Sequence, residues 1–253
     1  MRWNPYGFRL DTYPLPYWGR IPMTNPLFTR RQWLAGACCA SLGMAACIPS
    51  KTVVPRASEM EPRPENANEA LARLKQGNQR FMEDQPRHAD EKSSWRSLLV
   101  QAQKPFATVL GCSDSRVPPE LIFDVGFGDL FTIRLAGNII EEDVIGSLQY
   151  AVAHLHTHLI VVLGHEGCGA VTATVEEMLD KPKEPKHIES LIKAIRPGLN
   201  RLDLKQSRES LLRAAVEANV RWSMQQLLAL PEAQKTLQDK PVVLLGAVYE
   251  LNK

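Results

Sequence analysis

The sequence of 253 residues contains no apolar run of the roughly 20 residues that an ordinary membrane-spanning helix needs. It also shows no strong excess of charge, because 30 Lys and Arg face 28 Asp and Glu and the formal net charge is +2. This balance argues against a dedicated nucleic-acid-binding protein, which would carry a strongly basic surface. A hydrophobic content of 44% is ordinary for a globular protein.

Cysteine is scarce outside the N-terminal fifth of the chain. Cys38, Cys39 and Cys47 lie in that fifth, and the remaining two cysteines are Cys112 and Cys168. Two cysteines in the main part of the chain do not supply a disulfide framework. We therefore interpret Cys112 and Cys168 as metal-binding thiolates.

Both of these cysteines follow short apolar runs that are typical of buried strands. Cys112 comes just after the run 106–110, and His165 and Cys168 come just after the run 159–163. The carboxyl ends of parallel strands meet at one edge of a sheet, where ligands bind in open α/β folds. We expect the two sulfurs and the imidazole to converge there.

Two thiolates and one imidazole form a ligand set that suits zinc, and three protein ligands leave a fourth position open for water. Asp114 and Arg116 lie on the same turn as Cys112, with the i, i+2 spacing that can point both side chains toward one pocket. A bidentate Arg–carboxylate pair would hold Asp114 ionised and fixed. The alternative is a structural salt bridge at a strand end, but the position beside Cys112 favours a functional pair.

The motif Cys-Ser-Asp-Ser-Arg at 112–116 together with His-x-x-Cys at 165–168 resembles the β-class carbonic anhydrases. The resemblance covers roughly residues 66–250. It continues through the segments 126–131, 136–138, 146–152 and 246–249.

This resemblance implies an α/β fold, in which a parallel β-sheet core is covered by helices and an N-terminal helical arm packs on a partner subunit. A homodimer or a higher homo-oligomer is therefore expected. The implied reaction is the zinc-dependent reversible hydration of CO2 to bicarbonate and a proton by zinc-bound hydroxide. Cys112, His165 and Cys168 would bind Zn²⁺, and Asp114, held by Arg116, would accept the proton of the hydroxide.

In some β-class enzymes Asp114 would itself ligate zinc in a closed state, with bicarbonate held in a nearby regulatory pocket. Those enzymes have a Trp three residues before the first cysteine and an Arg on the following strand. Arg134 matches the Arg, but Val109 stands at the Trp position. We therefore expect an open, constitutively active site.

Three further residues, Gln103, Phe131 and Tyr150, match substrate-pocket positions of plant-like members of the class. A fourth candidate is Gly169, which follows Cys168 and whose small size would let backbone amides approach the substrate. Tyr150 would reach the pocket of a partner subunit. Each has a simpler reading: Phe131 and Tyr150 as core residues, Gln103 as a surface group, and Gly169 as the start of a tightly packed helix.

The N-terminal region has the pattern of an export signal. We interpret residues 1–22 as a mis-set or disordered leader, with Met23 as the true start, and 23–47 as a signal peptide of the twin-arginine type. Arg30 and Arg31 precede an apolar, Ala-rich segment. The alternative is a buried helix with two exposed arginines.

The segment Met44-Ala-Ala-Cys47 resembles a lipoprotein box, so we expect lipid on the Cys47 thiol and an exported, periplasmic, membrane-tethered protein. Ordinary cleavage in the Ala-rich stretch, or none, is the alternative. Residues 48–66 are rich in Pro, Ser and Glu, which suits a flexible tether. The carbonic anhydrase-like domain then occupies 67–253.

Hydrophobic periodicity predicts alternating helices and strands across this domain, which indicates a parallel sheet covered by helices. The predicted strands are 106–111, 130–134, 159–164 and 242–248. The predicted helices are 67–82, 95–102, 139–154, 170–179, 188–195 and 209–230.

Two other functions remain open from the sequence. The same fold and ligands would serve a hydrolase of COS or CS2, and sequence alone does not distinguish the two reactions. A non-catalytic zinc-binding lipoprotein is the third interpretation, which predicts loss of the acid–base pair. Asp114 and Arg116 are both present.

Overall fold

The computed structural model describes residues 62–180 and 184–251, which belong to one unit of the chain. The predictions for the leader 1–22, the signal peptide 23–47 and residues 48–61 of the tether 48–66 therefore fall outside the described residues. Among the described helices, none combines the length and the hydropathy that crossing a membrane requires.

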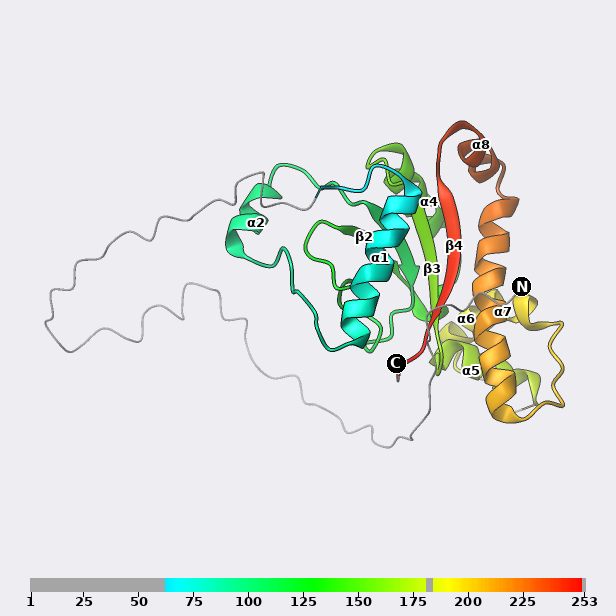
Figure 1. The fold of residues 1–253 in the computed structure, drawn as a ribbon. Coiled ribbons are helices and arrows are strands. Elements are labelled where there is room, and N and C mark those ends of the chain that lie inside the picture. The colour runs from blue at the N-terminus through cyan, green and yellow to red at the C-terminus, as the bar shows by residue number, and fades with distance from the viewer. Residues whose placement is uncertain (1–61, 181–183, 252–253) are drawn as a thin grey trace, which may run out of the picture. The chain divides into compact units, whose positions relative to one another are not determined.

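A four-stranded parallel sheet forms the centre of the described chain (Figure 1). Every residue of β1 is buried, and so is nearly all of β3, because helices cover both faces of the sheet. The strands in their spatial order are β2 (Leu130–Arg134), β1 (Ala107–Gly111), β3 (Leu159–His165) and β4 (Val243–Tyr249).

The strand order creates a topological switch point between β1 and β3. These two strands are paired neighbours, with Gly111 opposite Leu163. The chain leaves β1 toward β2 on one side and leaves β3 toward β4 on the other. Diverging connections of this kind open a crevice at the carboxyl ends of the strands, where open α/β folds bind ligands.

Nine helical elements surround the sheet within the described residues. They are α1 (Ala67–Met82), α2 (Ser93–Leu98), α3 (Pro119–Ile122), the 3-10 turn η3 (Ala136–Asn138), α4 (Glu142–Ala153), α5 (Gly169–Met178), α6 (Lys186–Leu199), α7 (Arg208–Ala229) and α8 (Pro231–Asp239).

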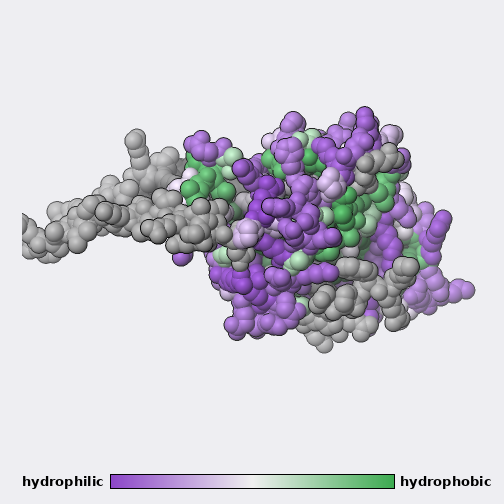
Figure 2. Space-filling model, turned by 45° about the horizontal axis from the view of Figure 1, so that its top comes forward, coloured by the Kyte–Doolittle hydropathy of each residue, from purple (hydrophilic) through white to green (hydrophobic). Residues whose placement is uncertain are grey.

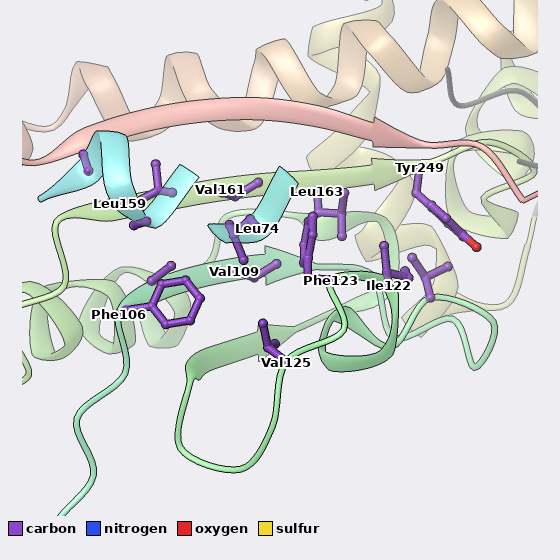
Figure 3. Packing of buried hydrophobic residues seen from close by; sticks show 14 residues of the cluster. Leu74, Phe106, Val109, Ile122, Phe123, Val125, Leu159, Val161, Leu163 and Tyr249 are labelled. Atoms are coloured by element: carbon purple, nitrogen blue, oxygen red, sulfur yellow. The ribbon is translucent and has the colours of Figure 1, made fainter. Parts of the chain in front are cut away.

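One face of the sheet packs against α1 and α3. Leu74 of α1 is buried with Val109 of β1 and Val161 of β3, as Figure 3 shows. The contact with the segment after α3 is close, because a Cβ added to Gly77 would lie 1.7 Å from the Phe123 carbonyl oxygen. The buried face of α1 lies in the core of its own chain, and the packing of this helix on a partner subunit, which the resemblance implied, stays a prediction.

The opposite face of the sheet packs against α4 and α7. Leu110 of β1 and Val162 of β3 are buried there with Val144 of α4 and Val220 of α7. A Cβ added to Gly164 would lie 2.5 Å from a methyl carbon of Val220. Glycine at this position therefore lets α7 lie close to β3.

The structure confirms the predicted order of strands and helices, with differences at several boundaries. The predicted helix 139–154 begins only at Glu142, because Ile139 and Glu141 have extended backbone angles. The strand β2 was predicted to be buried, but only Ile133 is, because β2 lies at the sheet edge.

The remaining boundary differences lie in helices. Helix α6 runs on to Leu199 with Pro197 inside it, and α2 begins at Ser93 and ends at Leu98 instead of spanning 95–102. Helix α8 was not predicted. Its first residue, Pro231, is a residue type that favours the start of a helix.

A buried carboxylate ties α1 to the end of α3. The Asp124 side chain accepts a hydrogen bond from Arg80 Nε at 2.5 Å and others from the backbone amides of Arg87 and His88. Burial by itself would raise the pKa of the Asp124 carboxyl, but these hydrogen bonds outweigh burial and hold the pKa below its ordinary value.

We predict that Asp124→Asn lowers the free energy of unfolding at pH 7 by about 3–5 kcal/mol, because it leaves Arg80 without its buried partner. Because the pKa of Asp124 is lower in the folded state, its charge stabilises the fold at pH values above the unfolded-state pKa of about 3.9, and this stabilisation is lost as the pH falls. The difference in the free energy of unfolding between wild type and variant, measured by urea denaturation, should therefore narrow below about pH 5.

The matched control is Asp84→Asn, because Asp84 is exposed and also has a positive φ of 53°. It should change stability by less than about 0.5 kcal/mol. If the difference in the free energy of unfolding between wild type and Asp124→Asn stays constant as the pH falls, the role of the Asp124 charge is contradicted.

Candidate metal centre

The three predicted metal ligands come together at the switch point of the sheet. Cys112 is the first residue after β1, His165 is the last residue of β3, and Cys168 immediately precedes α5. Their ligand atoms all lie within 4.8 Å of one another, and all three residues are buried. The convergence expected from the sequence is therefore present.

The distance between the two sulfurs distinguishes a metal site from a disulfide. The Sγ atoms of Cys112 and Cys168 are 4.0 Å apart, and both cysteines are free. A disulfide would require about 2.05 Å. Two sulfurs that each lie about 2.3 Å from a tetrahedral zinc ion are about 3.8 Å apart. The observed spacing therefore fits two ligands of one ion.

The His165 ring is oriented so that the lone pair of Nε2 can bind a metal ion together with the two sulfurs. Its Nδ1 lies 2.9 Å from the carbonyl oxygen of Glu166, and a carbonyl oxygen only accepts, so Nδ1 carries the proton. The lone pair is then on Nε2, which is buried and has no hydrogen-bond partner within the part of the chain that the structure describes. A buried polar atom without a partner is rare, and a metal ion at this position would satisfy it.

The surroundings of the Cys112 sulfur favour its negative charge. The Gly137 amide donates to Cys112 Sγ at 3.3 Å. Hydrogen bonding from the Cys168 thiol, partly opposed by burial, lowers the pKa of Cys112 to about 4. The pKa of Cys168 is raised because its thiol is the donor in that bond and is buried. Metal binding displaces this second proton, since a coordinated thiol is deprotonated.

Asp114 and Arg116 form the bidentate pair that their spacing suggested. Arg116 Nε donates to Asp114 Oδ1 at 2.9 Å, and Nη2 donates to Oδ2 at 2.7 Å. These hydrogen bonds outweigh burial and lower the pKa of the Asp114 carboxyl to about 2. Asp114 Oδ2 also lies 3.8 Å from His165 Nε2. The structure thus places an ionised, oriented carboxylate beside the three ligands.

Arg134 holds the turn that carries Cys112 and Asp114. Its Nε donates to the Cys112 carbonyl oxygen at 2.8 Å, and its Nη2 donates to the Asp114 carbonyl oxygen at 2.5 Å. The resemblance had matched Arg134 to an anion-binding residue of a regulatory pocket. Val109, at the matching Trp position, lies fully buried in the middle of β1. The main-chain contacts of Arg134 were not predictable from the sequence, and the strand pairing of Gly111 with Arg134 explains them.

The other predicted pocket residues do not gather around this site in the single chain. Phe131 pairs in register with Thr108, three residues before the end of β1, and its ring centroid is 6.1 Å from that of Tyr150. Gln103 is exposed and precedes β1, whereas the metal ligands follow strand ends. Of the four, only Gly169 adjoins a ligand.

The alternative interpretation of Gly169, as the start of a tightly packed helix, is wrong. A Cβ added to it would meet nothing within 4 Å, so packing does not require glycine there. The residue is exposed beside the buried Cys168 and leaves open space at that ligand.

Comparison with known proteins identifies the family. A family model described as "Carbonic anhydrase" matches residues 107–253. A solved structure described as the β-carbonic anhydrase CcaA is 28% identical, with a TM-score of 0.58 over 72% of this chain and 90% of that one. The chain belongs to the β-class carbonic anhydrase family.

Other carbonic anhydrases show similar agreement. Carbonic anhydrase 2 of Mycobacterium tuberculosis is 41% identical over 138 residues, which is 51% of this chain and 67% of that protein. The carbonic anhydrase of Mycolicibacterium smegmatis is 45% identical over 139 residues, with the same coverage. The Coccomyxa β-carbonic anhydrase, solved in complex with acetazolamide, is 27% identical with a TM-score of 0.59, over 72% of this chain and 83% of that one.

We predict that Cys112→Ser abolishes stoichiometric zinc binding, because the hydroxyl replaces a thiolate that zinc prefers. Elemental analysis after gel filtration should find about one zinc per wild-type chain. His187→Ala, which removes an exposed imidazole of α6 outside the site, is the control and should keep its zinc. A Cys112→Ser protein that retains one tightly bound zinc would contradict the assigned ligand set.

Proposed function

We propose that this β-class carbonic anhydrase catalyses the reversible hydration of CO2 to bicarbonate and a proton at the centre formed by Cys112, His165 and Cys168. The observation that carries this proposal is the buried three-ligand cluster beside a carboxylate that Arg116 holds ionised. Membership of the family and the names of the relatives support the same reaction.

The donor set fits zinc as its resident ion. Two thiolates and a neutral imidazole balance the charge of Zn²⁺ and leave a fourth position open. Zinc bound there would supply a Lewis acid that lowers the pKa of water to about 7, which makes a nucleophile available at neutral pH.

Asp114 orients the nucleophile. Because its carboxylate is ionised, it is an acceptor only, and it accepts a hydrogen bond from the attacking oxygen. This contact directs a lone pair of that oxygen toward the carbon of CO2. The two hydrogen bonds from Arg116 keep the carboxylate from rotating away, and the Arg134 contacts fix the backbone beneath it.

The same contacts support an open, constitutively active site. Both carboxylate oxygens of Asp114 are bound by Arg116, so Asp114 is held as an acceptor for the nucleophile. Arg134 is engaged with two carbonyl oxygens instead of facing an anion. A buried Val109 does not offer the ring nitrogen that a Trp would bring to a regulatory pocket.

We predict that Asp114→Asn lowers kcat for CO2 hydration by about 10²–10⁴-fold while zinc content stays unchanged. The amide retains the shape but loses the negative acceptor. Stopped-flow measurement of CO2 hydration, with COS and CS2 hydrolysis assayed in parallel, also separates this function from that of a related hydrolase.

A matched control for this variant is Asp203→Asn. Asp203 is exposed and, like Asp114, accepts a hydrogen bond from the backbone amide two residues later, at 3.0 Å. It should leave turnover unchanged. Full activity in a zinc-loaded Asp114→Asn protein would refute the role of this carboxylate, and a zinc-loaded wild type without turnover would favour a non-catalytic zinc protein.

We further propose that the protein is a homodimer or a higher homo-oligomer. The pocket residues Phe131 and Tyr150 lie together away from the metal centre of their own chain, as expected if they serve the site of a partner. Tyr150 and Phe127 are about half exposed, and Figure 2 shows separate hydrophobic patches between hydrophilic side chains on one face. Light scattering should give a mass of at least two chains, and a monomer with full activity would contradict this arrangement.

Export and lipid anchoring are also proposed, on the sequence pattern alone. The twin-arginine route carries folded proteins, so zinc can be loaded before Cys112 and Cys168 meet an oxidising compartment. We expect Arg30→Lys with Arg31→Lys to retain the protein in the cytoplasm, and Cys47→Ala to release it from membranes into the soluble periplasmic fraction. Cell fractionation that finds both variants distributed as wild type would contradict the proposal.

A further inference from the structure

A buried polar network joins helix α7 to the turn η3. Asn138 of η3 and Asn219 and Ser223 of α7 are each no more than 1% exposed. Asn219 and Ser223 are four residues apart on one helix, so they lie on the same face. The residues that surround them belong largely to hydrophobic clusters, which makes polar side chains here unusual.

The network holds two successive main-chain carbonyl groups of the turn. Asn219 Nδ2 donates to the Gly137 carbonyl oxygen at 2.8 Å, and Ser223 Oγ donates to the Asn138 carbonyl oxygen at 2.9 Å. The Asn138 side chain completes the network, because its Nδ2 donates to Ser223 Oγ at 3.2 Å. Helix α7 therefore fixes the turn from one side through direct hydrogen bonds.

The turn has an uncommon backbone conformation, which these hydrogen bonds help to maintain. Gly137 has a φ of 73°, which glycine adopts readily, but Asn138 has a φ of 44°. A residue other than glycine stays in this left-handed region where surrounding contacts maintain it. On another side the turn is packed tightly, since a Cβ added to Gly137 would lie 2.7 Å from Ile195 Cδ1.

The same turn provides a hydrogen bond to a metal ligand. In this conformation the Gly137 amide points at Cys112 Sγ and donates to it at 3.3 Å. An N–H donor stabilises negative charge on a thiolate and fixes the direction of its lone pairs. Rotation of the Ala136–Gly137 peptide would turn this N–H away from the Cys112 sulfur.

We propose that Asn219 and Ser223 are positioning residues for the metal-binding sulfur of Cys112, which they control through the Gly137 amide. The proposal rests on the proposed zinc centre. A leucine in place of Asn219 would fill the space without the cost of burying an amide, whose Oδ1 has no hydrogen-bond partner among the described residues. Asn219 and Ser223 are polar because their hydrogen bonds fix the η3 turn, and this turn places the Gly137 amide against Cys112 Sγ.

The test compares Asn219→Leu and Ser223→Ala with wild type in the full-length protein. Zinc affinity, measured by competition with a chelator, should fall about 10–100-fold in Asn219→Leu, the range typical of residues that support metal ligands. Ser223→Ala removes little volume, so it should fold and show a smaller loss in the same direction. In the Co²⁺-substituted protein, the sulfur-to-cobalt charge-transfer band should shift in both variants.

The matched control is Asn78→Leu. Asn78 is a buried helix residue whose Nδ2 also donates to a main-chain carbonyl oxygen, that of Ile122 at 3.1 Å, but this bond joins α1 to α3, away from the metal ligands. It should lower the stability of the fold and leave both the zinc affinity and the cobalt band unchanged.

Two results would overturn the proposal. One is wild-type zinc affinity and an unshifted cobalt band in both α7 variants, and the other is an equal loss of affinity in Asn78→Leu, which would indicate a general effect of stability. Failure of the zinc centre itself would appear separately, in a wild type that binds neither zinc nor cobalt.

Discussion

The metal centre depends on the distance between two sulfurs, those of Cys112 and Cys168, which lie in turns that follow different strands. They must be close enough to bind one metal ion and too far apart to form a disulfide. Cys112 and Cys168 are 56 residues apart in the sequence, and their Sγ atoms are 4.0 Å apart. The third buried ligand atom, His165 Nε2, carries a lone pair and has no hydrogen-bond partner among the residues that the structure describes. A single metal ion would bind all three buried atoms at once.

The fold meets this requirement by fixing main chain on several sides of Cys112. The parallel pairing of β1 with β3 brings the turns that follow these two strands to the same edge of the sheet. Arg134 from β2 donates hydrogen bonds to the carbonyl groups of Cys112 and Asp114. The Gly137 amide approaches the sulfur from η3, which α7 holds in place. The metal-binding turn thus depends on a neighbouring strand and on a helix from the last quarter of the chain.

Local patterns in the sequence were sufficient to predict the strands, most helices and the three ligands, because apolar runs that end in Cys or His mark strand ends directly. The functions of Arg134 and Asn219 were not predictable, since each acts on main-chain atoms brought near only by the tertiary fold. The edge position of β2 likewise depends on strand order, and the late start of α4 depends on the extended backbone at Ile139 and Glu141. The roles of Gln103, Phe131 and Tyr150, which came from resemblance alone, remain predictions because the chain does not bring them to its own site.

The central claim is that Cys112, His165 and Cys168 bind one zinc ion and leave one position for water. X-ray absorption at the zinc edge tests it most directly on the purified full-length protein. We predict two sulfur scatterers at about 2.3 Å and two nitrogen or oxygen scatterers at about 2.0–2.1 Å. A shell of four sulfurs, or one without sulfur, would contradict the account.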